Sequence, residues 1–262
     1  MTLKKNPLIL GVLNLTPDSF SDGGKYNDLD SALARAEDLE KQGADFLELG
    51  GESTGPNSKF VSAQTELKRV LPVLKVLRKK TQLPIFIDTY KAKVAAAALA
   101  SGAHGINDVT ALRGDPRLVA VLAQAKCPVV LMFAKDATPR TTIYPQHYSD
   151  VLAVIKKFLR ERVAFATQNK IKREQIIVDP GLGHFISSEK QYSYEIIARL
   201  SELQELNCPI LLGISRKSFL GGELKNRDER GLPLTGVAYL NGASIIRTHA
   251  VQATHDFLAR FH

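Results

Sequence analysis

The chain has little cysteine and no long apolar run, and both absences exclude classes of protein. Its two cysteines, Cys127 and Cys208, lie far apart without metal-type spacing, so we expect buried thiols and not a disulfide or a ligand pair. No apolar stretch reaches the ~18 residues that a membrane-spanning helix needs. Residues 1–7 lack the apolar core of a signal peptide, and we expect a cytoplasmic protein with no membrane partner.

The chain also lacks a dense basic tract, although its net charge is +8. The basic residues are scattered along helix-like segments. The longest cluster, residues 78–80, closes a helical pattern, where cations interact favourably with the helix dipole. We therefore expect no nucleic-acid partner. A positive potential would instead raise the encounter rate of anionic small ligands.

Short apolar runs that lead into a charged or amide residue recur along the whole chain. Runs of this length indicate strands buried on both faces, as in a parallel sheet covered by helices. Because parallel strands end at the same edge, we expect their polar ends to meet at one mouth. These ends are Asn14, Glu52, Asp88, Asn107, Asp179, Arg216, Lys217 and Arg247.

Helical patterns alternate with the apolar runs, and no linker interrupts them. Four runs are introduced by proline, three follow a Gly-Ala pair, and one more begins at Ile176. Eight strands, each followed by helix-forming sequence, fit a closed α/β barrel better than an open sheet. We therefore predict a single TIM (β/α)8 barrel, one domain over residues 1–262. Its helices are expected at about 29–42, 63–80, 91–101, 117–125, 150–169, 189–206 and 251–261.

Three long polar loops follow predicted strands, where barrel enzymes build their sites. They cover residues 16–27, 53–58 and 134–147. The first combines glycines with acids and hydroxyls, as a mobile lid would. A solvated loop without function is the alternative for this segment.

Six short motifs carry a specific resemblance. In order they are NLTPDSFSDG from Asn14, GGEST at 50–54, IDT at 87–89, IND at 106–108, DPG at 179–181 and SRKS at 215–218. Their order and spacing resemble dihydropteroate synthase over nearly the full chain. The resemblance implies a pterin-binding TIM barrel and a transferase of folate biosynthesis. That family condenses 6-hydroxymethyl-7,8-dihydropterin diphosphate with 4-aminobenzoate and releases diphosphate.

The strand-end residues suit a pterin ring. The ring presents adjacent N–H donors, which the carboxylate of Asp179 can accept as a pair, flanked by the amide of Asn107. Asp88 would meet the opposite side of the ring. Lys217 would donate to ring acceptors, and Arg247 would stack on the ring face. The alternative is that the two acids only cap strands or form salt bridges.

A leaving diphosphate requires stabilised negative charge at the mouth. Arg247 and His249 would bracket the phosphates, although His249 is equally compatible with an ordinary partly buried histidine. Asn14 fits a Mg²⁺ ligand as a single oxygen donor, which suits an ion that keeps most of its waters.

The resemblance also implies roles on the loops. Diphosphate leaves first, and a pterin-methylene cation forms that the aromatic amine attacks. Asp18 would stabilise this cation, so Asp18, Lys217 and Arg247 are the candidate catalytic residues. Thr54 and Ser218 would contact the aminobenzoate. Closure of the first loop would exclude water from the cation.

The chain departs from the family pattern around the second substrate. Gly55 stands where the family has an arginine, which removes an anion contact. Phe133 follows Met132 where the family has histidine. After the DPG motif, residues 183–186 read Gly-His-Phe-Ile where the family has Gly-Phe-Gly-Lys, so a phenylalanine that packs the second substrate is displaced or replaced.

Two further departures concern the end of the chain. Ala250 replaces the acid of the family's Arg-Val-His-Asp motif. Residues 231–242 are shorter than the family's seventh helix, and Pro233 and Gly236 are expected to weaken a helix there. That region often lies at the family's dimer interface, so the resemblance implies a homodimer whose interface this departure would weaken.

Three hypotheses follow. The first is a working dihydropteroate synthase that needs Mg²⁺ and both substrates. The second is a non-catalytic or altered-specificity pterin-binding paralogue. The third, a pterin-dependent methyltransferase on a related barrel, fits the first and last motifs less well.

Overall fold

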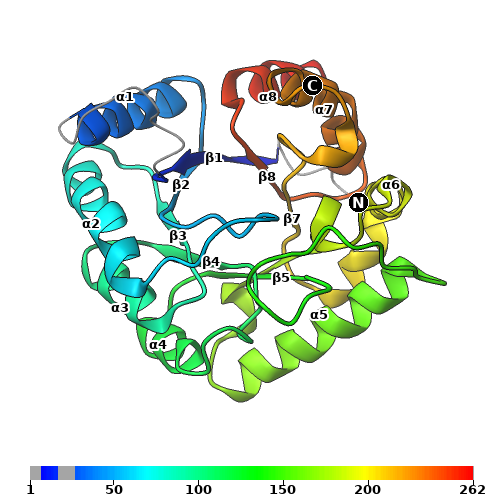
Figure 1. The fold of residues 1–262 in the computed structure, drawn as a ribbon, viewed down its shortest axis with the longest axis horizontal. Helices are drawn as coiled ribbons and strands as arrows, with labels where there is room; N and C mark the ends of the chain where they lie inside the picture. The colour runs from blue at the N-terminus through cyan, green and yellow to red at the C-terminus, as the bar shows by residue number, and fades with distance from the viewer. Residues whose placement is uncertain (1–6, 17–26, 262) are drawn as a thin grey trace.

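The computed structural model of the protein describes residues 7–16 and 27–261. Within them, eight parallel strands follow the order β6-β5-β4-β3-β2-β1-β8-β7. The outermost two, β6 and β7, are joined by a parallel bridge between Val178 and Ile210, so the sheet closes into a barrel (Figure 1). The predicted barrel is confirmed. The strands are β1 (Leu8–Asn14), β2 (Phe46–Gly50), β3 (Ile85–Asp88), β4 (Gly105–Asp108), β5 (Val129–Met132), β6 (Ile176–Asp179), β7 (Leu211–Leu212) and β8 (Ile245–Thr248).

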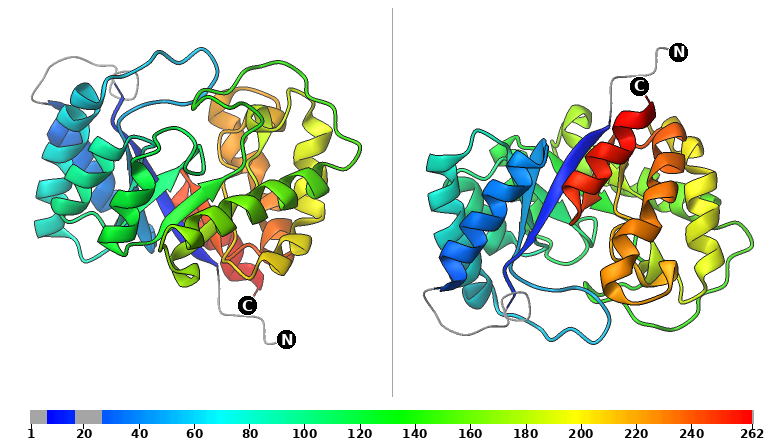
Figure 2. Two further views of the ribbon diagram at one scale, coloured as in Figure 1. Left: turned by 90° about the horizontal axis from the view of Figure 1, so that it is seen from below. Right: turned by 90° about the horizontal axis from the view of Figure 1, so that it is seen from above.

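Helices surround the barrel on the outside (Figure 1). They are α1 (Asn27–Lys41), α2 (Ala63–Lys80), α3 (Ala92–Ala100), α4 (Leu118–Ala125), α5 (Val151–Gln168), α6 (Lys190–Ala198), α7 (Leu224–Leu240) and α8 (Val251–Leu258). The predicted segment 189–206 divides into α6 and a 3-10 helix, Leu200–Leu206. The loops after β2 and β5 lie at one end of the barrel and the end of α8 at the other (Figure 2).

The expectation of a weak helix around Pro233 and Gly236 was wrong. Helix α7 begins at Leu224 and runs through both residues. Proline removes one helical hydrogen bond but leaves the rest of the helix intact when packing supports it. That support comes from a buried face. A Cβ on Gly231 would lie 3.1 Å from a methyl carbon of Ile214, so the helix lies very close to the loop after β7.

The core has two layers. Large apolar side chains of the strands and helices fill the space between the barrel and its surrounding helices. A smaller cluster fills the inside of the barrel, where Gly105 leaves room for the ring of Phe86, since a Cβ there would lie 2.5 Å from a ring carbon. The inner cluster contains Leu10, Phe86, Val130, Leu211 and Ile245.

The barrel interior changes from apolar to polar along the strands. Residues two apart on a strand point to the same face. Apolar interior residues are therefore followed by polar ones on the same face, nearer the carboxyl ends. The pairs are Phe46 and Glu48, Phe86 and Asp88, Ile177 and Asp179, and Ile245 and Arg247. This polar layer forms the floor of the site.

Both cysteines are buried and free, which confirms the expected thiols. Within the described ranges, no helix is long and apolar enough to cross a membrane.

Candidate active site

A pocket opens at the carboxyl ends of the strands. Val109, Met132, Leu182 and Phe185 form its apolar wall. Six residues proposed from the sequence also line it. Five of them are predicted polar strand ends, so the expected gathering is confirmed for those five, and the sixth, Thr54, comes from a loop. The six are Thr54, Asp88, Asn107, Asp179, Lys217 and Arg247.

Glu48 organises the floor of this pocket, and the sequence analysis missed it. Its side chain is 1% exposed and accepts Arg247 Nε at 2.8 Å. Arg247 Nη2 also contacts it. Its second oxygen accepts Asn107 Nδ2 at 2.8 Å. The signal was an acid inside the apolar run of β2, two residues after Phe46 and therefore on the interior face.

Asn107 presents an unused acceptor. Because its Nδ2 donates to Glu48, its Oδ1 is the end that stays available. This oxygen is buried and has no hydrogen-bond partner among the described residues. An unsatisfied buried acceptor is costly, so the site is suited to a ligand that brings a donor.

Asp179 is held at the end of β6 by its own loop. Gly181 N donates to its Oδ1 at 2.7 Å. Gly181 has φ +69°, and a Cβ there would collide with the carbonyl oxygen of Phe133, so only glycine suits this turn. Burial raises the pKa of Asp179 to about 6, opposed by the Gly181 hydrogen bond and by Lys217.

Asp88 lines the same pocket as Asp179. Its side chain is only 14% exposed, and its Oδ2 lies 3.5 Å from Arg247 Nη2. Burial, together with the charge of Glu48, raises the pKa of Asp88 to about 8, although Arg247 acts in the opposite direction. Asp88 therefore favours its protonated form more strongly than an ordinary carboxyl does.

Lys217 stands between two pockets. Its Nζ lies 4.8 Å from the centre of the Phe185 ring. Burial lowers the pKa of Lys217 to about 8, although Asp179 raises it. The residue lines both the first pocket and a second, neighbouring one.

Some of the residues that depart from the family pattern lie in the wall of the second pocket. Its wall includes Gly55 and His184, together with the cations Arg216 and Arg227. Ser218 also lines it, and its Oγ lies 2.9 Å from His184 Nε2. Thr54 and Ser218, predicted to contact one substrate, therefore line different pockets, which share Leu182, Phe185 and Lys217.

Asn14 and His249 lie together, outside the lining of both pockets. Asn14 Nδ2 is 3.3 Å from His249 Nε2, and His249 Nδ1 is 2.9 Å from Ser215 Oγ. Ser215 Oγ also lies 2.6 Å from Asp228 Oδ1, on α7. Burial, followed by the charge of Arg247, lowers the pKa of His249 to about 2, so the ring is neutral.

These contacts assign the protons. The single hydroxyl proton of Ser215 goes to the carboxylate of Asp228, so His249 Nδ1 must donate to Ser215. His249 Nε2 is then an acceptor, which fits the amide nitrogen of Asn14 and turns Asn14 Oδ1 away from the ring. One free amide oxygen fits Mg²⁺ that keeps several waters. In the described ranges, no group of three or more His, Cys, Asp or Glu is arranged to hold a metal ion.

Two further predictions concern the first loop and Glu52. Asp18 and most of the first loop lie outside the described residues. Glu52, expected at the mouth, lines neither pocket. It is buried and forms ion pairs with Lys91 and Arg140, and Lys91 also pairs with Glu66. This cluster was not anticipated, because its members come from four separate segments.

The chain matches the family described as pterin binding enzyme over residues 10–249. It is 38% identical over 254 residues to the dihydropteroate synthase of Synechocystis sp., covering 95% of this chain and 87% of that one. The solved Xanthomonas albilineans dihydropteroate synthase with 4-aminobenzoic acid is 37% identical with a TM-score of 0.91, covering 100% of this chain and 93% of that one. The same enzyme in complex with 7,8-dihydropteroate is 35% identical with a TM-score of 0.87, covering 100% and 94%.

Proposed function

The chain belongs to the dihydropteroate synthase family of pterin-binding enzymes, and from this premise we propose how its residues divide the work of the reaction. The reaction is a transfer in folate biosynthesis. It condenses 6-hydroxymethyl-7,8-dihydropterin diphosphate with 4-aminobenzoate and releases diphosphate. In this proposal the whole chain acts as one barrel domain.

The first pocket takes the pterin. Two hydrogen-bond acceptors in this pocket can face the N–H edge of the pterin. They are the carboxylate of Asp179 and the Oδ1 of Asn107, which has no partner among the described residues. This pairing is the observation that carries the proposal, since paired N–H donors satisfy both groups at once. Asp88 serves the other side of the ring. Lys217 donates to ring acceptors, and Arg247 covers the ring face.

The second pocket takes 4-aminobenzoate. Arg216 and Arg227 supply positive charge for its carboxylate, and the Ser218 hydroxyl supplies a hydrogen bond. Phe185 lines both pockets, so it can pack the aromatic ring while the amine points toward the pterin. Thr54 lines the first pocket, whereas the resemblance implies that it contacts the aminobenzoate.

The phosphate end lies toward β1 and β8. Arg247 neutralises developing charge on the leaving diphosphate, and His249 acts as a neutral partner instead of a cation. Asn14 Oδ1 would hold Mg²⁺, which when bound supplies positive charge to the diphosphate. Asp18 stabilises the pterin-methylene cation in this proposal.

Glu48 holds the side chains of the pocket floor in place. By binding both Arg247 and Asn107, it fixes the side chains on opposite sides of the pocket floor. It also provides the negative charge that Arg247 needs inside the barrel, where an unpaired cation would be costly.

We also propose a cytoplasmic location and a homodimer. Two buried, free thiols support a reducing compartment. Exposed Val237 and Leu240 on α7 offer apolar surface for a second copy. Sedimentation of the purified protein tests the dimer.

The test of the function is an assay of the purified protein with Mg²⁺ and both substrates, following diphosphate and dihydropteroate together. Equal rates of the two products are expected. Pterin binding without any aminobenzoate-dependent product would instead favour the non-catalytic paralogue.

A further inference from the structure

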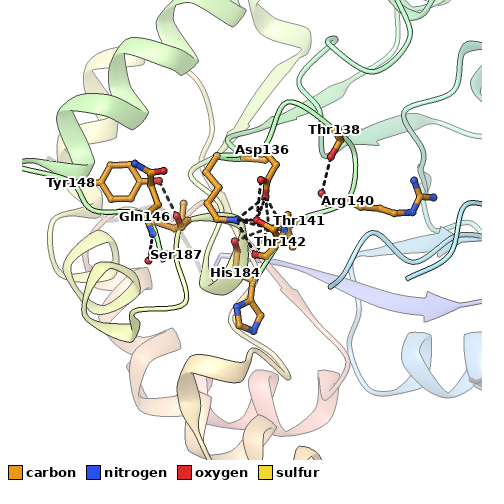
Figure 3. A network of polar contacts seen from close by, with 12 residues as sticks. Asp136, Thr138, Arg140, Thr141, Thr142, Gln146, Tyr148, His184 and Ser187 are labelled. Carbon is orange, nitrogen blue, oxygen red and sulfur yellow. Dashed lines mark hydrogen bonds and ion pairs between the residues drawn. The ribbon is translucent and has the colours of Figure 1, made fainter. Parts of the chain in front are cut away.

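The loop after β5, residues 134–147, carries a network of polar contacts around Asp136, Thr141 and Thr142 (Figure 3). Lys135 lies at the centre of this network. The Lys135 side chain is 7% exposed. Its Nζ donates to Asp136 Oδ2 at 2.8 Å, to Thr142 O at 2.9 Å and to Thr142 Oγ1 at 2.8 Å. Asp136 Oδ2 also accepts the backbone N–H of Thr142 at 2.9 Å. All three donors of the lysine are satisfied, so this part of the loop has one well-defined shape.

Thr141 connects this polar knot of Lys135, Asp136, Thr141 and Thr142 to the rest of the mouth. Its side chain is buried, and its one hydroxyl proton goes to the nearer acceptor, His184 O at 2.7 Å, so that Asp136 Oδ2 at 3.0 Å is a neighbour and not a second acceptor. Its backbone N–H donates to Thr54 O at 3.2 Å. One residue therefore joins the loops that follow β2, β5 and β6.

Four consecutive residues of the loop after β6 are held from the β5 side. Lys135 N donates to Phe185 O at 2.8 Å, and Thr141 Oγ1 reaches His184 O. Tyr148 Oη donates to Ile186 O at 2.8 Å, and Gln146 N donates to Ser187 Oγ at 3.0 Å. The conformation of residues 184–187 thus depends on the neighbouring loop at every position.

The residues held in this way form the wall of the second pocket. His184 and Phe185 both line it. The ring of His184 is directed at Ser218, and that of Phe185 lies beside Lys217. A shift of the β6 loop would therefore move the aromatic wall and change the hydrogen bonding of Ser218 together. A displacement of about 1 Å is enough to cost much of an enzyme's rate or affinity.

We propose that the knot is the positioning element of the second substrate's pocket. Asp136 is a positioning residue, and Thr141 both lines the pocket and positions His184. The inference rests on the proposed function, which assigns that pocket to 4-aminobenzoate. The β5 loop sets affinity for this substrate through His184 and Phe185. The pterin contacts Asp179 and Asn107 are held separately, by Gly181 and by Glu48.

The test compares two threonines of the same loop. Thr141→Val removes the hydroxyl that reaches His184. Thr138→Val is the matched control, because the exposed Thr138 hydroxyl donates to Arg140 O within its own loop, at 2.9 Å. We expect Thr141→Val to raise the KM for 4-aminobenzoate by roughly tenfold, the factor that one buried hydrogen bond represents. The kcat and the pterin Kd should stay within about twofold, and Thr141→Ser should restore the KM.

Asp136→Asn is a second, independent test, since it keeps the side-chain shape but removes the charge that Lys135 and Thr142 share. It should raise the same KM while leaving pterin affinity unchanged. Equal KM values for Thr141→Val and Thr138→Val would overturn the inference, as would equal losses of affinity for both substrates. A wild-type protein that makes no aminobenzoate-dependent product would instead reject the proposed function itself.

Discussion

Glu48 on β2 and Arg247 on β8 form an ion pair inside the barrel, across β1, which lies between their two strands. The pair occupies the polar layer directly above the apolar filling of the barrel. The pair affects both the stability of the barrel and the geometry of the pocket proposed for the pterin, because the Glu48 carboxylate also fixes Asn107.

Glu48→Gln should therefore weaken folding and pterin binding together. The glutamine keeps the shape but leaves Arg247 without its counter-charge, and a hydrogen bond to a charged group contributes about 1.5–3 kcal/mol. We expect a loss of that size in the free energy of unfolding, measured by urea denaturation. Glu37→Gln breaks an exposed pair with Lys80 and should cost less than about 1 kcal/mol. Equal costs for the two variants would contradict the role assigned to Glu48.

Pterin affinity should fall at low pH because Asp179 must be ionised to accept two donors. Its pKa is about 6, so protonation begins to compete with the ligand as the pH falls through that value. One proton taken up at this site weakens binding by about tenfold per pH unit below 6. Isothermal titration from pH 5 to pH 8 measures this.

Asp179→Asn should bind pterin weakly at every pH in that range, because its amide cannot ionise. A variant that retained the wild-type affinity would reject the placement of the pterin in the first pocket. A variant with weak affinity and an unchanged pH profile would show that another group titrates.

Asp88 should make the substrate-free protein less stable as the pH rises. Its pKa is raised from 3.8 to about 8, so the folded state binds this proton more tightly than the unfolded chain does. That contribution is complete below about pH 4 and is lost as the pH rises to about 8. Asp88→Asn removes it, and the stability of the variant relative to wild type should increase with pH between 5 and 8, by at most about 1.4 kcal/mol per pH unit.

Asp115→Asn is the control for this titration. Hydrogen bonds from Arg117 lower the pKa of Asp115 to about 2, so this acid is already ionised across the same range. Its substitution should change stability by a constant amount from pH 5 to pH 8. A constant offset for Asp88→Asn as well would contradict the raised pKa.

The fold was predictable because each strand is a short apolar run with a marked beginning and end. Pro84 begins one such run and Asp88 ends it, and β3 occupies Ile85–Asp88. The same rule found Asp179 and Arg247, since carboxyl ends of parallel strands meet at one mouth. It missed Glu48, which lies within an apolar run instead of at its end.

The remainder of the site depends on contacts that no local pattern encodes. Asp228 reaches Ser215 from α7, a helix that Pro233 made improbable from propensity alone. The Lys135 knot requires a loop conformation in which neighbouring residues pair with each other, and Thr141 meets His184 from 43 positions away. Such contacts follow from the closed barrel, which brings the loops together.

Ser215 should control the use of Mg²⁺ without touching the ion. In the wild type its hydroxyl requires a proton on His249 Nδ1, which leaves Nε2 to accept from Asn14 Nδ2. Ser215→Ala removes this constraint, so the ring can carry its proton on Nε2. Asn14 then turns its oxygen toward the histidine and away from the position proposed for Mg²⁺. Loss of a residue that orients a metal ligand typically weakens metal affinity by about 10- to 100-fold.

We therefore expect Ser215→Ala to need at least about tenfold more Mg²⁺ for half-maximal activity, with near-normal turnover at saturating metal. Metal titration by calorimetry in the presence of diphosphate should show the same loss without any turnover. Ser201→Ala, on an exposed 3-10 turn, is the matched control and should behave as wild type. If Ser215→Ala bound Mg²⁺ normally but lost turnover, Ser215 and His249 would act on the diphosphate itself, and Asn14 would not be the metal ligand that they orient.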